Sequence, residues 1–229
     1  HAAAGVYEGP VFVRAPRVTL AGAGRDATII RVPGGEASAF RTNGFAAVEV
    51  YATNVVLHGF AAQGGLAGIY VRPPAEAKFC VVSNCTFAAN GYGVLASDSV
   101  NDATSAGHWV TLSHCHVTNN LFSGVKANET VYMDNLLIAR NGYDGVRNIS
   151  GDRHSASIAV NCTIADNAGN GVYNPASWAS FQDYYNCVIA GHKIGAYRKD
   201  DLHSGGIRLY NCVLANATNC WTYRITTND

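Results

Sequence analysis

The stretch VVSNCTFAANGYGV, residues 81–94, decides the fold because it recurs along the chain. Its apolar residues are interrupted by an Asn-Cys pair and then by Asn90, Gly91 and Gly93, which breaks any long helical or strand period. Related segments occupy residues 110–125, 131–146, 156–172, 183–196 and, shortened, 207–217, with a weaker copy at 54–69. Repetition at this spacing is typical of a solenoid or a propeller.

The pattern inside each copy predicts strands. Alternation such as that of Val110 with Leu112, or Val131 with Met133, lasts only a few residues, whereas a helical solenoid needs roughly 10 to 15 residues of 3.6 period. Aligned copies lie 21 to 30 residues apart. Three short strands per turn of about 25 residues predict an all-β, single-stranded parallel β-helix of about seven to eight coils.

Two neighbouring columns of the alignment have structural roles. The first column holds Gly59, Cys85, Cys115, Leu136, Cys162, Cys187 and Cys212. The residues just before it are His58, Asn84, His114, Asn135, Asn161, Asn186 and Asn211. Since Asn and His tolerate positive φ, we expect this second column to form sharp bends and to stack as a ladder. The cysteines lack the spacing of metal or redox sites, which favours a buried apolar wall without successive disulfides.

The two halves of each repeat differ in length variation. From the aligned column to a following Gly-Val-like pair the distance is always 9 or 10 residues, whereas from that pair to the next column it ranges from 11 to 21. Most charged residues also lie in the variable half. Loops on a rigid scaffold are where binding and catalysis usually occur, so we expect function there.

Composition excludes some classes of protein. The 16 basic and 16 acidic residues give no net charge, which argues against a nucleic-acid partner. No apolar run approaches the roughly 18 residues of a membrane helix, so we expect no membrane span. No signal peptide is visible in a chain that starts at His1, and composition leaves the location open.

At this point the repeats resemble those of the right-handed parallel β-helix superfamily of pectate-lyase-like proteins. The resemblance covers roughly residues 48–217, and residues 5–30, GVYEGPVFVRAPRVTLAGAGRDATII, are similar to the opening coil of such proteins. It implies one domain with an N-terminal coil or cap at 1–47, repeats at 48–217 and a C-terminal end at 218–229. It also implies an extracellular or periplasmic, monomeric protein with a polysaccharide or oligosaccharide partner, but no particular activity.

In these relatives the substrate commonly lies along the strand that follows the repeat's glycine. In that strand the Val points inward and the next residue outward. The predicted outward column is therefore Tyr70, Leu95, Lys126, Arg147, Tyr173 and Tyr197. Lys126 and Arg147 are one coil apart, so their charges should repel and lower the pKa of Lys126. A lysine with a lowered pKa can serve as a general base.

This pair is similar to the Lys and Arg of the chondroitinase B and alginate lyase group. The similarity implies β-elimination on a uronic-acid polysaccharide, with Lys126 as base, Arg147 as stabiliser of the enolate or as acid, and Tyr173 or His154 as proton carrier. Those enzymes also use calcium held by acidic residues shortly before the Lys. Here that segment is VTNNLFSGV, with Asn119 and Asn120, and we therefore expect no metal cofactor. The segment DSVND at 98–102 offers a weak calcium alternative.

Other candidate residues flank the column. Trp178 could stack on a sugar ring or anchor its loop. The predicted substrate contacts are Tyr70, Arg72, Asp152, Trp178, Tyr197, Arg198 and His203.

Two other functions stay open. One is a non-catalytic polysaccharide-binding or structural module of a secreted or phage-associated protein. The other is glycoside hydrolysis by an acid pair drawn from Asp152, Asp200 and Asp201, which would need two carboxylates facing one cleft.

Overall fold

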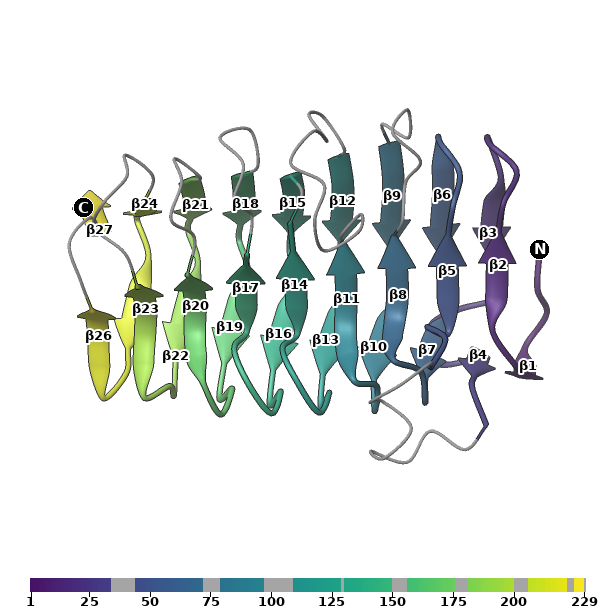
Figure 1. The fold of residues 1–229 in the computed structure, drawn as a ribbon, viewed down its shortest axis with the longest axis horizontal. Helices are drawn as coiled ribbons and strands as arrows, with labels where there is room; N and C mark the ends of the chain where they lie inside the picture. The colour runs from purple at the N-terminus through teal and green to yellow at the C-terminus, as the bar shows by residue number, and fades with distance from the viewer. Residues whose placement is uncertain are drawn as a thin grey trace.

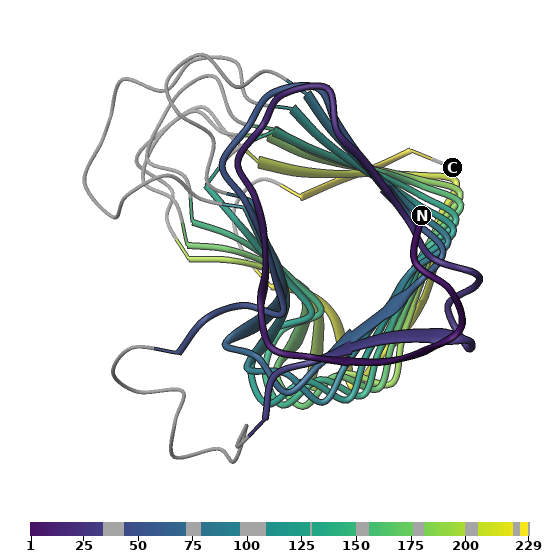
Figure 2. The same cartoon turned by 90° about the vertical axis from the view of Figure 1, so that its right-hand side faces the viewer.

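The computed structural model describes residues 1–33, 44–71, 79–96, 109–128, 130–149, 156–175, 181–199, 206–221 and 225–228. In these residues the chain forms strands joined by tight turns and winds about one long axis, with its termini at opposite ends (Figure 1). Seen from one end, three walls surround a common interior (Figure 2). No helix in this part of the chain is long and apolar enough to cross a membrane.

Each wall is a parallel sheet of nine strands. Sheet A contains β1 (Gly5–Glu8), β4 (Thr28–Arg31), β7 (Ala61–Gln63), β10 (Thr86–Ala88), β13 (His116–Thr118), β16 (Leu137–Ala139), β19 (Thr163–Ala165), β22 (Val188–Ala190) and β25 (Val213–Ala215). Sheet B contains β2 (Val11–Val13), β5 (Val48–Val50), β8 (Ala67–Val71), β11 (Tyr92–Ala96), β14 (Val125–Ala127), β17 (Val146–Asn148), β20 (Asn170–Asn174), β23 (Ile194–Arg198) and β26 (Thr218–Trp221). Sheet C contains β3 (Thr19–Ala21), β6 (Val55–His58), β9 (Phe79–Ser83), β12 (Trp109–Ser113), β15 (Thr130–Asp134), β18 (Ala156–Val160), β21 (Phe181–Tyr185), β24 (Gly206–Tyr210) and β27 (Ile225–Asn228).

The predicted all-β solenoid with three strands per coil is confirmed. The strands β2, β3 and β4 contribute one strand to each sheet before the repeats begin, and β26 and β27 extend two of the sheets after the last repeat. The division at residues 47 and 217 stays a prediction.

The bend column behaves as its residue types predict. Asn84, His114, Asn135, Asn161, Asn186 and Asn211 all have φ between 49° and 54°. The alignment of the weakest copy is wrong by one residue. His58 pairs with Ser83, so Gly59, with φ of 72°, makes the bend, and the fully buried Phe60 stands in the wall.

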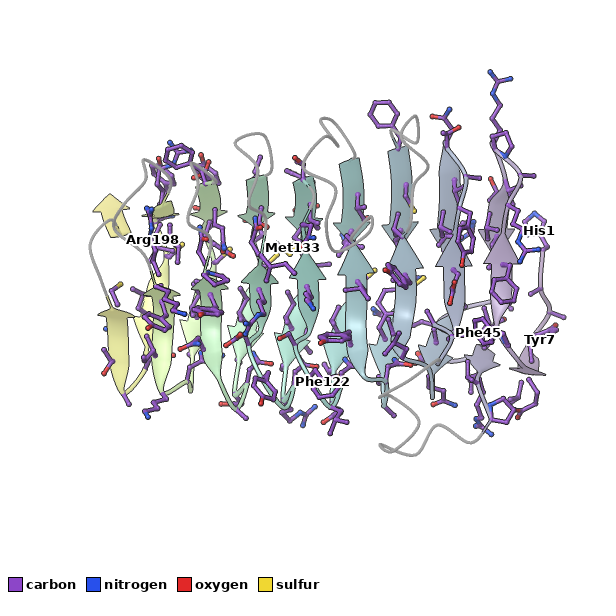
Figure 3. The ribbon with its side chains drawn as sticks, in the orientation of Figure 1. His1, Tyr7, Phe45, Phe122, Met133 and Arg198 are labelled. Atoms are coloured by element: carbon purple, nitrogen blue, oxygen red, sulfur yellow. The ribbon has the colours of Figure 1, made fainter. Side chains whose placement is uncertain are left out.

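The cysteine column forms part of the core. Cys85, Cys115, Cys162 and Cys187 are at most 1% exposed, and all seven cysteines of the chain are free thiols. Inward residues of the three sheets, such as Met133, fill the space between the walls (Figure 3). The wall interpretation of the cysteines is therefore confirmed.

The glycine of each repeat is required because there is no room for a side chain at its position. A Cβ on Gly145 would lie 2.6 Å from the carbonyl oxygen of Gly171 in the next coil and 2.5 Å from Cγ2 of Ile164. The equivalent glycines of the other coils meet the next coil in the same way; they are Gly68, Gly93, Gly124, Gly171 and Gly195. Stacked coils thus approach one another so closely here that a side chain cannot fit.

A buried polar ladder runs along the interior at the turn between sheets A and B. It consists of the buried Asn90, Asn120, Asn141, Asn167 and His192 and ends at the half-buried Asn216. The Oδ1 atom of Asn141, for example, accepts bonds from the backbone N of Asn120 at 3.1 Å and from its Nδ2 at 2.9 Å. The Nδ2 atom of Asn141 donates to Val117 O at 3.0 Å and to Asn167 Oδ1 at 2.8 Å. Each amide therefore ties its own coil to its neighbours.

The predicted ladder of the bend column is present in part, on the outer surface. Asn211 Nδ2 donates to Asn186 Oδ1 at 2.7 Å, and Asn186 Nδ2 donates to Asn161 Oδ1 at 3.4 Å. The amides that stack inside the solenoid belong instead to the turn between sheets A and B, as described above.

His192 replaces an asparagine in the buried ladder. Asn167 Oδ1 already accepts two bonds from Asn141, so the group facing His192 Nε2 at 3.1 Å is the donor Nδ2, and Nε2 must accept. Nδ1 then carries the proton and donates to Asn216 Oδ1 at 2.9 Å. Burial lowers the pKa of His192, opposed by the Asn216 bond and by Asp166 and Asp144. The neutral ring is the form that fits.

We expect acidification to weaken the fold through His192. The pKa of His192 is lower in the folded protein than in the unfolded chain, so the unfolded chain binds the proton first as the pH falls. The contribution of neutral His192 to the free energy of unfolding is therefore fully present above pH 6.5 and is lost as the pH falls below it. The loss cannot exceed about 1.4 kcal/mol per pH unit, which is the limit for a single proton. Denaturant unfolding of wild type and His192→Asn across this range isolates the effect. A difference between them that does not change with pH would contradict the prediction.

Candidate functional site

The outward residues of sheet B form one continuous column, as the alternation predicted. Strand pairing places Leu95 beside Lys126, Lys126 beside Arg147, and Arg147 beside Tyr173. The column continues to Tyr70 on one side and to Tyr197 on the other. Successive members of such a column leave the sheet about 4.8 Å apart, which is close enough for neighbouring side chains to contact the same small molecule.

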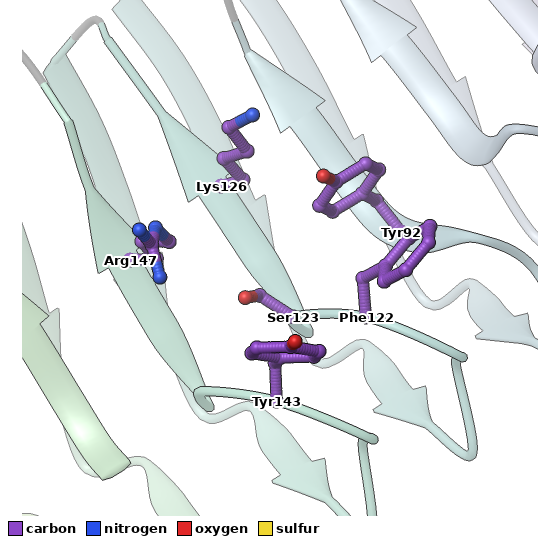
Figure 4. A pocket seen from close by; sticks show the side chains of 6 residues that line it. All are labelled: Tyr92, Phe122, Ser123, Lys126, Tyr143 and Arg147. Carbon is purple, nitrogen blue, oxygen red and sulfur yellow. The ribbon is translucent and has the colours of Figure 1, made fainter. Parts of the chain in front are cut away.

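A pocket of about 280 Å³ opens on this face (Figure 4). It is lined by Tyr92, Phe122, Ser123, Lys126, Tyr143 and Arg147. Tyr92 belongs to β11, Lys126 to β14 and Arg147 to β17, while the other three come from the turns that lead into β14 and β17. The pocket therefore spans three successive coils.

Three aromatic rings form one side of the pocket. The ring centroids of Tyr92 and Phe122 lie 5.0 Å apart, and those of Phe122 and Tyr143 lie 6.2 Å apart. All three occur one or two residues before a repeat glycine, at Gly93, Gly124 and Gly145. Because the coils stack in register, the same turn in successive coils builds an aromatic wall.

Lys126 reaches over this wall. Its Nζ lies 5.0 Å from the centroid of the Tyr92 ring, and its side chain is half-buried. Burial lowers the pKa of Lys126, and the neighbouring positive charge of Arg147 lowers it further. The pKa therefore moves in the predicted direction, but desolvation contributes more than the repulsion on which the prediction was based.

Arg147 is held by a buried carboxylate. Its Nη1 lies 3.0 Å from Oδ2 of Asp144, whose side chain is only 3% exposed. Oδ1 of Asp144 accepts from the backbone N of Asn170 at 2.9 Å and from its Nδ2 at 2.8 Å. The Arg147 guanidinium also lies 4.7 Å from the Tyr173 ring centroid. These contacts orient the guanidinium and offset part of its charge.

The aromatic surface extends along the column beyond Arg147. Tyr173 stacks on Tyr197 with centroids 5.2 Å apart and ring planes 22° apart. Burial raises the pKa of Tyr173, so its phenol stays protonated near neutral pH.

The residues before Lys126 do not fit a calcium ion. Asn119 has a φ of 56° and makes a bend, and the buried Asn120 uses its Oδ1 as the acceptor for Asn90. Asp144 beside the pocket accepts bonds at both oxygens. Within the described ranges no three His, Cys, Asp or Glu side chains are grouped to hold a metal ion. The alternative segment 98–102 lies outside the described residues.

The other predicted site residues have different positions. Tyr70 packs with Tyr92 against the buried Leu95 on the pocket's side of sheet B. Arg198 is fully buried and points into the solenoid, because it follows Tyr197 and alternation turns it inward (Figure 3). It is therefore not on the surface where a substrate contact was predicted. Arg72, Asp152, His154, Trp178 and His203 lie outside the described residues, as do Asp200 and Asp201.

The pocket also contains residues that the sequence analysis did not select. These are Tyr92, Phe122, Ser123 and Tyr143, together with Asp144 as the partner of Arg147. All belong to the half of the repeat with constant length, which was assigned to the scaffold. The available signal was the aromatic residue close to the repeat glycine in three successive copies.

Comparison with known proteins gives a fold. No protein-family model and no curated protein matches the chain. Among solved structures, pectin methylesterase from carrot matches with a TM-score of 0.70 and 13% identity over 99% of this chain and 77% of that one. The A-module of the Azotobacter vinelandii mannuronan C-5 epimerase AlgE6 matches with a TM-score of 0.67 and 13% identity over 93% of this chain.

The chain is a right-handed parallel β-helix. At this level of identity the likeness establishes the fold, and the β-helix spans only 65% of the epimerase module's length. A fold of this kind does not specify a function, which depends on the residues of the pocket.

Proposed function

We propose that this β-helix acts on an anionic, uronic-acid-containing polysaccharide by lyase-type β-elimination. The observation that carries the proposal is the pairing of Lys126 with Arg147 on adjacent strands lining one aromatic pocket. A uronate presents a carboxylate and a ring with apolar faces. Cationic groups beside aromatic rings are suited to both parts.

The pocket supplies a group for each step of an elimination. The free amine of Lys126 takes the proton from the carbon next to the carboxylate, and Arg147 stabilises the enolate that forms. The electron pair then forms the C=C bond while the bond from the neighbouring carbon to the leaving sugar oxygen breaks. That oxygen needs a proton, and we assign its delivery to Tyr92, whose pKa is raised by burial so that the phenol stays protonated.

The structural neighbours support a carbohydrate role for this fold. One is named for inverting C-5 of mannuronan and the other for its action on pectin. As part of the same proposal, the protein meets its polymer outside the cytoplasm or in the periplasm.

The test is an assay for unsaturated products. Wild-type protein is incubated with alginate, pectate and glycosaminoglycans, and with a neutral glucan as control, while the absorbance of the new C=C bond is followed. We expect a rise with at least one anionic polymer and none with the glucan. Binding without any rise would favour a binding module, and exchange of the uronate C-5 proton with solvent without chain cleavage would replace elimination by epimerisation.

A further inference from the structure

Lys126 is a half-buried cation that lies over an aromatic ring. Arg31, Arg147 and Arg208 each have a carboxylate partner, namely Glu8, Asp144 and Asp183. Within the described residues no carboxylate lies within ion-pair distance of Lys126, whose Nζ instead lies over the Tyr92 ring. An amine that is partly desolvated and beside another cation is present more often as the free base, which is the nucleophilic form.

Arg147 provides a guanidinium group on the strand next to Lys126, where it can bind a carboxylate. Asp144 takes a bond from one terminal nitrogen, Nη1, while a guanidinium has five N–H donors. The donors that remain can hold a carboxylate by paired hydrogen bonds. Because Arg147 is on the strand next to Lys126, a molecule held there by its carboxylate presents its adjacent carbon to the amine.

We propose that the pocket is an imine-forming site for 2-oxo carboxylates, in which Arg147 holds the carboxylate and Lys126 attacks the neighbouring carbonyl carbon. The Nζ lone pair forms the new C–N bond as the C=O π bond opens to an alcohol. The amine loses two protons in total, the carbonyl oxygen leaves as water with them, and a C=N bond remains. No electrons are gained or lost. The aromatic wall of Tyr92, Phe122 and Tyr143 lies on one side of the pocket in which the imine forms.

Two kinds of 2-oxo carboxylate are small enough for a pocket of about 280 Å³. One is a small free oxo acid such as pyruvate or glyoxylate. The other rests on the proposed function: elimination leaves an enol ether at the end of a uronate chain. Addition of water across its C=C bond gives a hemiketal, and opening of that ring places a ketone next to the carboxylate. In the second case the imine would form with the enzyme's own product and slow its release.

The experiment traps the imine. Wild-type protein is incubated with pyruvate or glyoxylate and cyanoborohydride, without polysaccharide, and the modified residue is located by peptide mass mapping. We expect a single adduct at Lys126, formed faster by on the order of tenfold than any adduct at the exposed Lys193 and Lys199. Lys126→Arg should remove it, and propionate, which has the carboxylate but no ketone, should slow it.

The outcomes separate the two proposals. No adduct, or equal labelling of Lys126, Lys193 and Lys199, overturns the imine site whatever the elimination assay shows. Adduct formation with small oxo acids supports it even if no polymer is cleaved. A further arm uses oxo acid end units prepared with a different lyase. Labelling by these at lower concentration than by pyruvate assigns the site to the polymer product, and preference for pyruvate assigns it to a free oxo acid.

Discussion

Replacing Lys126 with alanine is expected to lower kcat/KM on the cleaved polymer by about 10²- to 10⁴-fold, which is the usual contribution of a positioned general base. The half-buried side chain lies over Tyr92, so its removal leaves the sheet intact and takes away only the proton acceptor. Lys126→Arg should be equally inactive, because arginine keeps the charge but does not lose its proton in this pH range. Initial rates of unsaturated product formation measure the effect.

The dependence of kcat/KM on pH is a second test of Lys126 as the base. Only the unprotonated amine can act as base, so kcat/KM of the wild type should rise with pH through the lowered pKa of Lys126. Any residual activity of Lys126→Ala should lack this limb. Lys193→Ala removes an exposed lysine and is the matched control, expected to keep wild-type rates. Activity of Lys126→Ala within a few-fold of wild type would exclude Lys126 as the base.

Asn141→Ala is expected to lower the free energy of unfolding by about 3 to 5 kcal/mol. The substitution leaves Asn120 N and one N–H of Asn120 Nδ2 without the acceptor that they share, and it removes the Nδ2 donor to Val117 O. Asn167 Oδ1 loses one of its two bonds and keeps the one from the backbone N of residue 141. All of these groups are buried, so water cannot replace the lost bonds. Denaturant unfolding followed by circular dichroism measures the change.

The matched control is Asn161→Gly in the exposed bend column. Asn161 has a φ of 54°, which glycine adopts without strain, and its described amide contact is a long bond of 3.4 Å from Asn186. We expect a cost below about 1 kcal/mol. Similar losses for the two variants would mean that the buried ladder contributes no more than the surface one.

The sequence predicted the features that depend on local chemistry. Asn and His at one column indicated positive φ, and alternation after the repeat glycine placed Lys126 and Arg147 side by side. The buried ladder was missed because Asn90 was interpreted as a turn residue and Asn120 was considered only as a possible calcium ligand. A turn asparagine looks the same in a sequence whether its amide faces solvent or the next coil. Whether the amide faces solvent or the next coil depends on how the coils pack, and a single sequence does not contain that information.

The pocket was only half predictable for a related reason. Tyr92, Phe122 and Tyr143 lie in the constant half of the repeat, where regular spacing indicates scaffold. Their rings meet only because successive coils stack in register, so one turn of the scaffold also forms a wall of the site. The burial of Asp144 and its bond to Arg147 depend on the fold and could not be predicted from the sequence.

The buried ladder also has a direction. From Asn90 to Asn216 each link donates toward the coil nearer the C-terminus, so the amide dipoles add head to tail along the axis. Each bond in such a chain polarises the next, and a break in the middle divides one long array into two short ones. Coils that never touch a substituted ladder residue should therefore hold their own amides less firmly.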